Sequence, residues 1–182
     1  MSRRDEVIDA AERILEAEGL SALTMRRLGE ELAMRAPSLY KHVAGKPEIE
    51  AALQERALRQ VGAALAAAGP GLRGLAAAYR SWATKHPRLY DLATRRPLRR
   101  DDTTVAAEAY AEEPLLAVLG GNRDTARALW GVAHGLVDLE LAGRFPPDAD
   151  LDATWDAAMR AFSREFLAAG PVADDADDSV RD

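Results

Sequence analysis

The chain has 182 residues, of which 30 are acidic, 24 are basic and none is cysteine. This length suits one domain or two small ones, and the absence of cysteine excludes disulfides, thiolate metal sites and thiol nucleophiles. Hydrophobic residues make up 48% of the chain and aromatic residues only 5%, a composition that favours helix over strand. No apolar run reaches the roughly 18 residues of a membrane helix, and charges stand where a signal peptide needs apolar residues. We therefore expect an all-α, soluble, cytoplasmic protein without a membrane partner.

The first 46 residues contain three helical patterns. The first pattern predicts a helix that ends at Gly19 and buries one face, made of Val7, Ile8, Ala11, Ile14 and Leu15. Thr24 is the expected N-cap of a second helix, whose inner face carries Met25, Leu28 and Leu32. A third, short helix is expected to begin at Pro37. Proline has no backbone N–H group, and the first turn of a helix does not need one. A short helix joined by a turn to a preceding helix forms a helix-turn-helix.

The rest of the chain predicts a connecting helix and an all-helical body. The connecting helix runs from residue 46 toward Ala68 and is closed by Gly69-Pro70-Gly71, the clearest boundary in the chain. Further helices are expected over residues 72–86, 88–94, 103–119 (kinked or split at Pro114), 123–143 (capped by Asn122) and 151–169. The chain thus divides into a head (1–46), a connecting helix (47–70), a body (71–170) and a disordered acidic tail (171–182), with about nine helices.

Charge is distributed unevenly along the chain, whose net charge is −6. The last eleven residues hold five aspartates and one arginine, a balance of −4, whereas residues 24–47 hold five basic and two acidic side chains, a balance of +3. A basic segment in an acidic protein is compatible with DNA binding. It is more often a solvated helix face, so charge alone does not decide for DNA binding.

The third helix leaves one face exposed, which carries donors or small groups: Arg35, Ala36, Ser38, Lys41 and His42. Arg35 and Lys41 lie about one and a half turns apart, so both side chains can enter a DNA major groove about 12 Å wide. Thr24 and Lys46 stand at helix N-termini, where free N–H groups favour phosphate. Together with the Tyr40 hydroxyl, they predict contacts that position the protein on DNA without reading its sequence.

The head contains an ordered motif of LTMRRLGEEL at residues 23–32, APSLYKHV at residues 36–43 and Lys46. In this motif the head resembles the DNA-binding domain of the tetracycline-repressor (TetR) family. The resemblance implies a homodimeric transcription regulator, usually a repressor, that leaves its operator when a small ligand binds the body. The backbone contacts that it implies are Tyr40, His42 and Lys46, with Thr24 and Met25 at the start of the second helix. The implied groove-facing set is Arg26, Arg35, Ala36, Pro37 and Lys41.

Two positions depart from the family pattern. Ala33 stands in the turn where the family commonly has glycine, and a left-handed alanine there costs about 1 kcal/mol relative to glycine. Arg35 stands where the family often has a serine cap, which suggests that it is placed for DNA or that the helix start is frayed.

The body resembles one subgroup of the same family. Residues 128–140 (ALWGVAHGLVDLE) resemble its Trp–His–Gly C-terminal domain, and residues 79–83 and 86–90 match the same subgroup. Head and body together extend the resemblance over about residues 5–168. An unidentified small-molecule effector is expected between the helices. The candidate pocket residues, each of which also suits the core, are Tyr79, Trp82, Tyr90, Tyr110, Trp130 and His134.

The last two long helices carry more apolar residues than one core needs. The candidate dimer-interface residues are Leu129, Val132, Leu136, Leu139, Trp155, Met159 and Phe162. Family members usually pair these helices as a four-helix bundle, and a two-fold dimer implies a palindromic, double-stranded DNA operator. Gly131 and Gly135 form a track of small residues that suits either a helix crossing within one chain or the dimer contact.

Competing functions have weaker support. His134 and Asp138 are four residues apart and could share a metal, but no third ligand is visible, so we expect a packed histidine and no metal or cofactor. A helical enzyme that uses His86 or His134 as a base lacks any nucleophile motif, phosphate loop or metal cluster. An adaptor module whose head has lost DNA affinity is favoured only by Ala33.

Overall fold

The structure is a computed structural model that describes residues 2–69 and 71–169, except for the side chains of Ala36 and residues 164–169. This part of the chain contains nine α-helices and no strand, which confirms the all-α prediction. The helices are α1 (Arg3–Glu18), α2 (Met25–Glu31), α3 (Ala36–Leu39), α4 (Lys46–Ala66), α5 (Gly71–Lys85), α6 (Pro87–Arg95), α7 (Asp102–Val118), α8 (Arg123–Leu141) and α9 (Leu151–Ala169). The acidic tail expected at 171–182 lies outside the described residues.

The first helix, α1, begins and ends where its free backbone groups find partners. The Ser2 hydroxyl accepts a hydrogen bond from the Asp5 N–H at 3.1 Å, and the Asp5 carboxylate accepts one from the Ser2 N–H at 2.8 Å. At the other end Gly19 has φ 88°, and its N–H donates to the Leu15 carbonyl. The inward face expected from the sequence is buried: Val7, Ile8, Ala11, Ile14 and Leu15.

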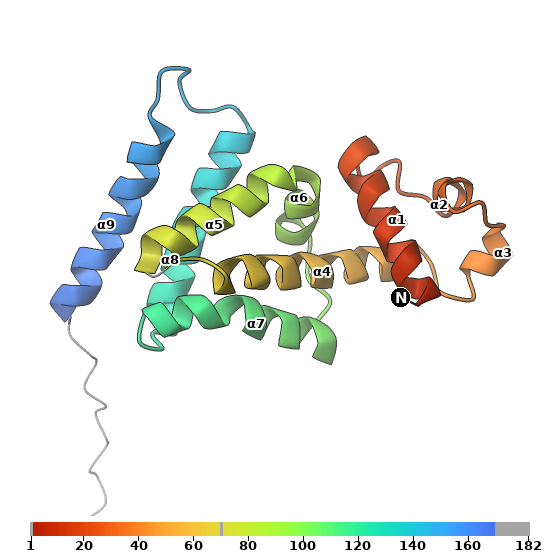
Figure 1. The fold of residues 1–182 in the computed structure, drawn as a ribbon, viewed down its shortest axis with the longest axis horizontal. Coiled ribbons are helices and arrows are strands. Elements are labelled where there is room, and N and C mark those ends of the chain that lie inside the picture. The colour runs from red at the N-terminus through yellow and green to blue at the C-terminus, as the bar shows by residue number, and fades with distance from the viewer. Residues whose placement is uncertain (1, 70, 170–182) are drawn as a thin grey trace, which may run out of the picture.

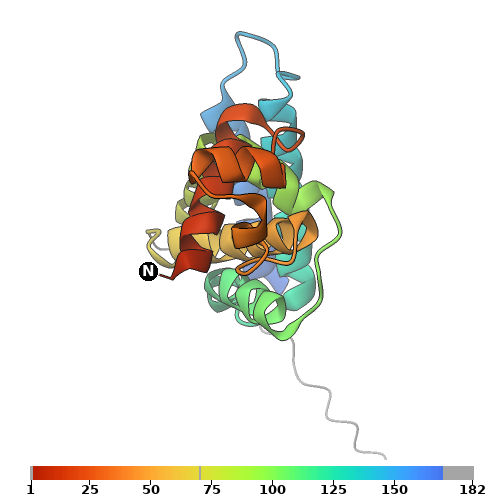
Figure 2. The same ribbon diagram turned by 90° about the vertical axis from the view of Figure 1, so that its right-hand side faces the viewer.

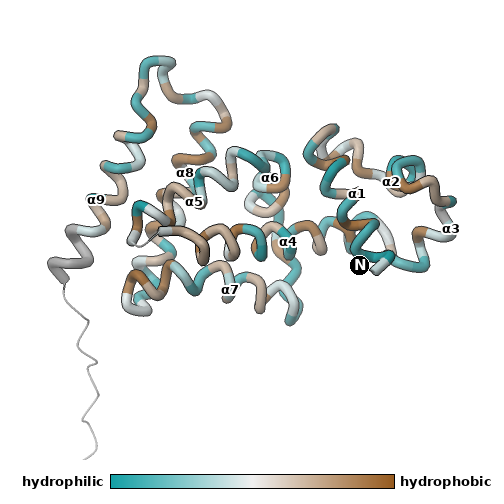
Figure 3. The backbone as a smooth tube through the Cα atoms, in the orientation of Figure 1, coloured by the Kyte–Doolittle hydropathy of each residue, from teal (hydrophilic) through white to brown (hydrophobic). Residues whose placement is uncertain are grey.

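The helix α4 connects the head to the body, with α5 and α7 on opposite sides of its far half (Figure 1). Hydrophobic and hydrophilic residues alternate along it, as expected for a helix packed on several neighbours (Figure 3). Its approach to α7 depends on Gly62, because an added Cβ would stand 2.5 Å from Cδ1 of Tyr110. The helix α4 thereby fixes the head at one end and the body at the other.

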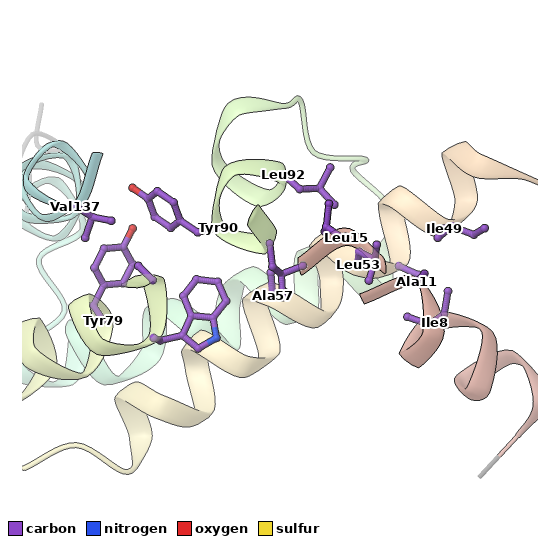
Figure 4. Packing of buried hydrophobic residues seen from close by; sticks show 14 of the residues in the cluster. Ile8, Ala11, Leu15, Ile49, Leu53, Ala57, Tyr79, Tyr90, Leu92 and Val137 are labelled. Atoms are coloured by element: carbon purple, nitrogen blue, oxygen red, sulfur yellow. The ribbon is translucent and has the colours of Figure 1, made fainter. Parts of the chain in front are cut away.

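One continuous hydrophobic cluster extends from the head into the body. Figure 4 shows Leu15 of α1, Leu53 and Ala57 of α4 and Leu92 of α6 lying together, with Tyr90 farther along toward α8. The same cluster contains residues of α1, α4, α6 and α8, so the core of the head and the core of the body are continuous.

Polar contacts join the head to the body beside this core. Arg56 of α4 donates to Asp9 at 2.7 Å and to Glu12 at 2.8 Å, both on α1. Glu16 of α1 caps α6, because its carboxylate accepts the Leu89 N–H at 2.7 Å and its carbonyl accepts from the Arg88 guanidinium at 3.0 Å. The helix α6 is therefore held by the head at its first turn.

The last two helices pack on α5. Arg80 of α5 binds both oxygens of Glu140 on α8, at 2.8 and 2.9 Å, and Asp152 on α9 at 2.6 Å. Its guanidinium also lies 5.9 Å from the ring centroid of Trp155. This single side chain fixes the relative positions of α5, α8 and α9.

Most predicted helix limits are confirmed within one or two residues, and one detail differs. Of the kink or split that Pro114 predicts in the helix over 103–119, the split is absent, because α7 continues through Pro114 as one helix. The missing N–H of Pro114 leaves the carbonyl of Tyr110 without its helical partner.

Candidate functional site

The second helix of the head, α2, is fixed by its cap and by two buried residues. The Thr24 hydroxyl accepts the Arg27 N–H at 3.1 Å, which confirms Thr24 as the N-cap. Leu28 and Gly29 are buried and turn the opposite face, which carries Arg26, toward solvent. The half-buried Met25 packs against the core at the start of the helix.

The turn between α2 and α3 is tight. The Met34 N–H donates to the Gly29 carbonyl at 2.8 Å, and a Cβ on Gly29 would stand 2.7 Å from the Met34 carbonyl oxygen. Ala33 has φ 50°, so the left-handed alanine considered from the sequence is present. The turn that the family commonly builds on glycine is thus closed here with alanine.

The third helix and the residues after it form the exposed end of the head, which faces the viewer in Figure 2. Arg35 precedes α3 and its carbonyl accepts the Ser38 N–H at 2.9 Å, so it holds the N-cap position through its backbone. Leu39 and Val43 point into the core. The predicted surface residues are exposed at Arg35, Pro37, Tyr40 and Lys41, and half-buried at Ser38 and His42. The side chain of Ala36 lies outside the described residues.

The cations of the head fall into two groups. Arg27 is held by Glu18 at 2.7 Å and by Glu31 at 3.0 Å, which makes it a structural residue. Arg26 pairs only with Glu30, one turn away on the same helix, and its side chain is exposed. Arg35 and Lys41 have no acidic partner among the described residues. Their charges are available to an anionic partner without breaking a contact inside the protein.

Lys46 has a structural contact of its own. Its amino group donates to the Leu20 carbonyl at 3.0 Å, which ties the start of α4 to the link after α1. A lysine ammonium has three donors, so this contact leaves donors for a phosphate. Lys46 also lies 3.9 Å from Glu50, one turn farther along α4.

Four of the six candidate pocket residues come together between α5, α6 and α8. The Tyr90 hydroxyl lies 2.5 Å from Nδ1 of His134, and the ring of Tyr79 meets that of Tyr90 edge-on at 6.4 Å. Figure 4 shows the hydroxyl ends of both tyrosines directed toward α8, beside Val137. The Trp130 ring is stacked on His134, with centroids 5.5 Å apart and an interplanar angle of 17°. We call Tyr79, Tyr90, Trp130 and His134 the aromatic cluster.

The cluster contains a polar atom without a partner. The hydroxyl of Tyr79 is buried and makes no hydrogen bond with the described residues. Burial raises the pKa of Tyr79 to about 12, and burial also raises the pKa of Tyr90. Both phenols therefore remain protonated at neutral pH.

The other two candidate pocket residues lie elsewhere. Trp82 is buried beside the cluster, and its indole N–H donates to Oε1 of Gln60 on α4 at 3.1 Å. Tyr110 packs over Gly62 and lines an open groove of about 680 Å³ between α7 and the start of α8. The structure thus separates Tyr110 from the aromatic cluster.

The candidate dimer residues also divide into two groups. Leu129, Trp155 and Met159 are buried within the protomer, at 3–6% exposure, so they belong to its core. Val132 and Leu139 are exposed, and Leu136 and Phe162 are half-buried. Helical periodicity alone did not distinguish these sets, because it does not say which face α5 covers.

His134 and Asp138 do not share a ligand site. His134 faces Tyr90, whereas Asp138 pairs with Arg95. In the described part of the chain no three histidine or acidic side chains gather as a metal site would require. Over the same residues, no helix combines the length and apolar character that crossing a bilayer demands.

A helix-turn-helix whose short third helix is flanked by exposed cations, on an all-helical body, defines the class of helix-turn-helix regulators. The chain belongs to the tetracycline-repressor family of transcriptional regulators. Residues 7–53 match the model of bacterial regulatory proteins of the tetR family, and residues 72–162 match that of the tetracyclin repressor-like C-terminal domain. The finer assignment to a Trp–His–Gly type of C-terminal domain stays a prediction.

Relatives of known sequence or structure agree with this assignment. The chain is 34% identical over 172 residues to the uncharacterized HTH-type transcriptional regulator Rv0681 of Mycobacterium tuberculosis, covering 86% of this chain and 78% of that protein. It is 44% identical over 55 residues to the HTH-type transcriptional repressor DrrR1 of Streptomyces coeruleorubidus, covering 30% and 20% of the two chains. The solved regulatory protein SCO4313 is 26% identical with a TM-score of 0.76, covering 87% and 94%.

Some contacts were not predicted from the sequence. The cap that Glu16 provides to α6 joins residues 73 positions apart, and no local pattern marks it. A cleft of about 490 Å³ where the ends of α1, α4 and α7 meet is likewise formed by distant residues, among them Arg4, Glu48 and Arg99. The only available signal was the polarity of these side chains, which is common on any helix surface.

Proposed function

We propose that the protein is a homodimeric repressor that binds a palindromic DNA operator and is released by a small molecule. The observation that carries the proposal is the pair of free cations, Arg35 and Lys41, beside the exposed third helix of a helix-turn-helix. In this class the second helix of the motif enters the major groove. The proposed division remains a head (1–46), a connecting helix (47–70) and a ligand-binding and dimerisation body (71–170).

In this proposal two kinds of contact hold the DNA. Arg26, Arg35, Ala36, Pro37 and Lys41 face the groove. Tyr40 and His42 bind the sugar–phosphate backbone, and so does Lys46 through the donors that Leu20 leaves free. Thr24 and Met25 present the N-terminal end of α2, whose N–H groups favour phosphate. Ser38, half-buried on α3, is a small hydrogen-bonding group at the same surface.

The proposed dimer contact uses one face of α8 together with α9. Ala128, Val132, Gly135, Leu139 and Ala142 follow one helical face by their spacing of four, three, four and three residues. A Cβ added to Gly131 or Gly135 meets no atom within 4 Å, so no described part of the same protomer occupies the glycine track. That supports its use by a second protomer. On α9 the exposed residues Ala153, Ala157 and Ala161 offer a matching strip of small side chains.

The proposed effector site is the aromatic cluster. Its support is the unpartnered Tyr79 hydroxyl and the position of Tyr90 on α6, the helix whose first turn Glu16 of the head caps. Displacement of Tyr90 by a ligand would therefore move a helix that the head holds directly. Repression as the mode of action is supported by the relative DrrR1, which is described as a transcriptional repressor and is similar over 55 residues. We also propose that this regulator is located in the cytoplasm.

Salt dependence of DNA binding tests the head. On a random 30-base-pair duplex, the logarithm of the association constant should fall linearly with the logarithm of salt concentration. Lys46→Ala should reduce this slope by about one, because it removes the cation that the proposal places on phosphate. Arg127→Ala, which removes an exposed arginine of α8, is the matched control and should leave the slope unchanged. Equal slopes for all three proteins would instead favour an adaptor module with an impaired head.

A further inference from the structure

Trp130 is the most exposed member of the aromatic cluster. The residue is 51% exposed, which is unusual for the largest apolar side chain, yet its ring lies flat on His134. Trp130, His134 and Asp138 share one face of α8 by their spacing of four residues, and this face is turned toward α6, where Tyr90 and Arg95 contact it. The proposed dimer face lies on another side of α8. Trp130 therefore lies on the solvent side of the cluster, stacked on the ring of His134.

Beside Trp130 lies the hydroxyl of Tyr79, which is 92% buried as a residue and has no hydrogen bond of acceptable geometry within the described residues. Tyr90 and Trp130 are its polar neighbours, and they lie close enough to offset part of the rise in its pKa that burial causes. Trp130 offers only a donor, and the Tyr90 hydroxyl contacts His134. Among the described residues the proton of Tyr79 is therefore without a well-placed acceptor. A buried donor without an acceptor is uncommon in native structures and marks a place where a ligand can supply one.

The charged groups beside the cluster are already paired with one another. The charged groups that act on Tyr90 are Asp138 and Arg95, which form an ion pair with each other, and Arg95 also binds Asp91. An anionic ligand would therefore meet two carboxylates that share one arginine, and a cationic ligand would have to compete with Arg95 for them. The cluster already accommodates one aromatic ring stacked on His134, the indole of Trp130.

We propose that Trp130 occupies the ligand position of this cluster, and that the effector is a neutral, planar aromatic molecule carrying a hydrogen-bond acceptor. The ligand ring replaces the indole on His134, and its acceptor receives the Tyr79 hydroxyl proton. This inference rests on the proposed response to a small molecule and adds the chemical class and the residue that gates the site. Because Trp130 must leave the ring of His134, the ligand competes with a side chain of the protein itself.

Equilibrium dialysis with 2-naphthol and naphthalene tests this inference on the full chain. Both probes are neutral and planar at pH 7, but only 2-naphthol has an acceptor oxygen. Trp130→Ala should bind both probes about two- to tenfold more tightly than the wild type, because the competing stacked pair is gone. Adding Tyr79→Phe to Trp130→Ala should weaken 2-naphthol by about two- to tenfold and leave naphthalene unchanged.

Tyr110→Ala is the matched control, since it removes a partly exposed aromatic ring on α7 away from the cluster. It should bind both probes as the wild type does. Weaker binding in Trp130→Ala, no dependence on Tyr79, or loss of binding in Tyr110→Ala would each overturn the inference. DNA binding measured on the same samples keeps the two proposals separate. A failed ligand test with intact DNA binding refutes only this inference, and absent DNA binding in the wild type refutes the proposed function.

Discussion

Ala33 closes the turn between α2 and α3 with φ 50°, the left-handed conformation that alanine adopts at a cost. The tight contact of Gly29 with the Met34 carbonyl leaves the chain little choice of path at this point. The surrounding head therefore imposes this backbone on Ala33, and the strain is concentrated in one residue.

Replacing this residue with glycine should relieve the strain. We expect Ala33→Gly to raise the free energy of unfolding by about 1 kcal/mol, and the melting temperature by about 2–4 °C. Differential scanning calorimetry measures both quantities. Ala67→Gly is the control, because Ala67 has an ordinary right-handed backbone at the end of α4 and should gain nothing. A lower melting temperature for Ala33→Gly would show that the turn is not strained.

Tyr79 gives a second prediction at this scale, in the alkaline range. Its pKa is raised by burial to about 12 in the folded chain, above the ordinary value of 10. Between these values the unfolded chain loses the proton more readily, so stability falls as pH rises from 10 toward 12. Tyr79→Phe lacks this loss and also lacks an unsatisfied buried hydroxyl, so it should be at least as stable as the wild type at pH 7. Urea unfolding at pH 7 and pH 11 measures both effects, and equal pH dependence in the two proteins would contradict the assignment.

The sequence predicted the structural roles of some single residues but not of others. Thr24 and Asn122 were identified as caps, because a cap depends on residues two or three positions away. The contact of Tyr90 with His134 joins residues 44 positions apart and depends on how α6 crosses α8. The burial of Trp155 likewise follows from the position of α5. Such contacts depend on helix crossings, which side-chain periodicity does not specify.

The helix α6 is the element that links the body to the head. Its first turn is capped by Glu16 of α1, and Gln54 of α4 donates to the Leu92 carbonyl at 3.2 Å. In the same helix Tyr90 reaches α8. The sequence predicted this helix, but its contacts depend on residues far away in the chain, which explains why its connecting role was missed.

Removing the cap that Glu16 provides should destabilise the first turn of α6. Glu16→Ala leaves the N–H of Leu89 without its acceptor and should lower the free energy of unfolding by about 1 kcal/mol, a usual value for a lost cap. Amide hydrogen exchange should become faster at Leu89 than in the wild type. Glu18→Ala is the matched control, because that carboxylate binds Arg27 instead of α6. Unchanged exchange at Leu89 would show that Glu16 does not hold the helix.

The two surfaces that the proposed function uses lie at opposite ends of the molecule. The head exposes cations that have no acidic partner among the described residues at one end, while α8 and α9 expose small and apolar residues at the other, as Figure 1 shows for the positions of these helices. Fold class and head were predicted from the sequence, because their helical periods and motifs are local. The separation of core from exposed face on α8 required the structure.

The exposed face of α8 yields a prediction for the assembly. Leu139→Glu places a charge in the proposed dimer contact and should convert a dimer, of twice 19.7 kDa, into a monomer. Light scattering after gel filtration measures the mass. Val105→Glu is the matched control, because Val105 is also exposed, at 51%, but lies on α7. A dimer that survives Leu139→Glu and separates with Val105→Glu would move the interface to α7.

The most direct test of the account is selection of bound duplexes from a random DNA pool by the purified full chain at moderate salt. A two-fold operator should emerge as a palindromic consensus with half-sites about one helical turn or more apart. The same selection with Arg35→Ala should give a consensus that is less defined at one position of each half-site. No enrichment by the wild type, even at low salt, would contradict the account and leave the head without a DNA-binding role.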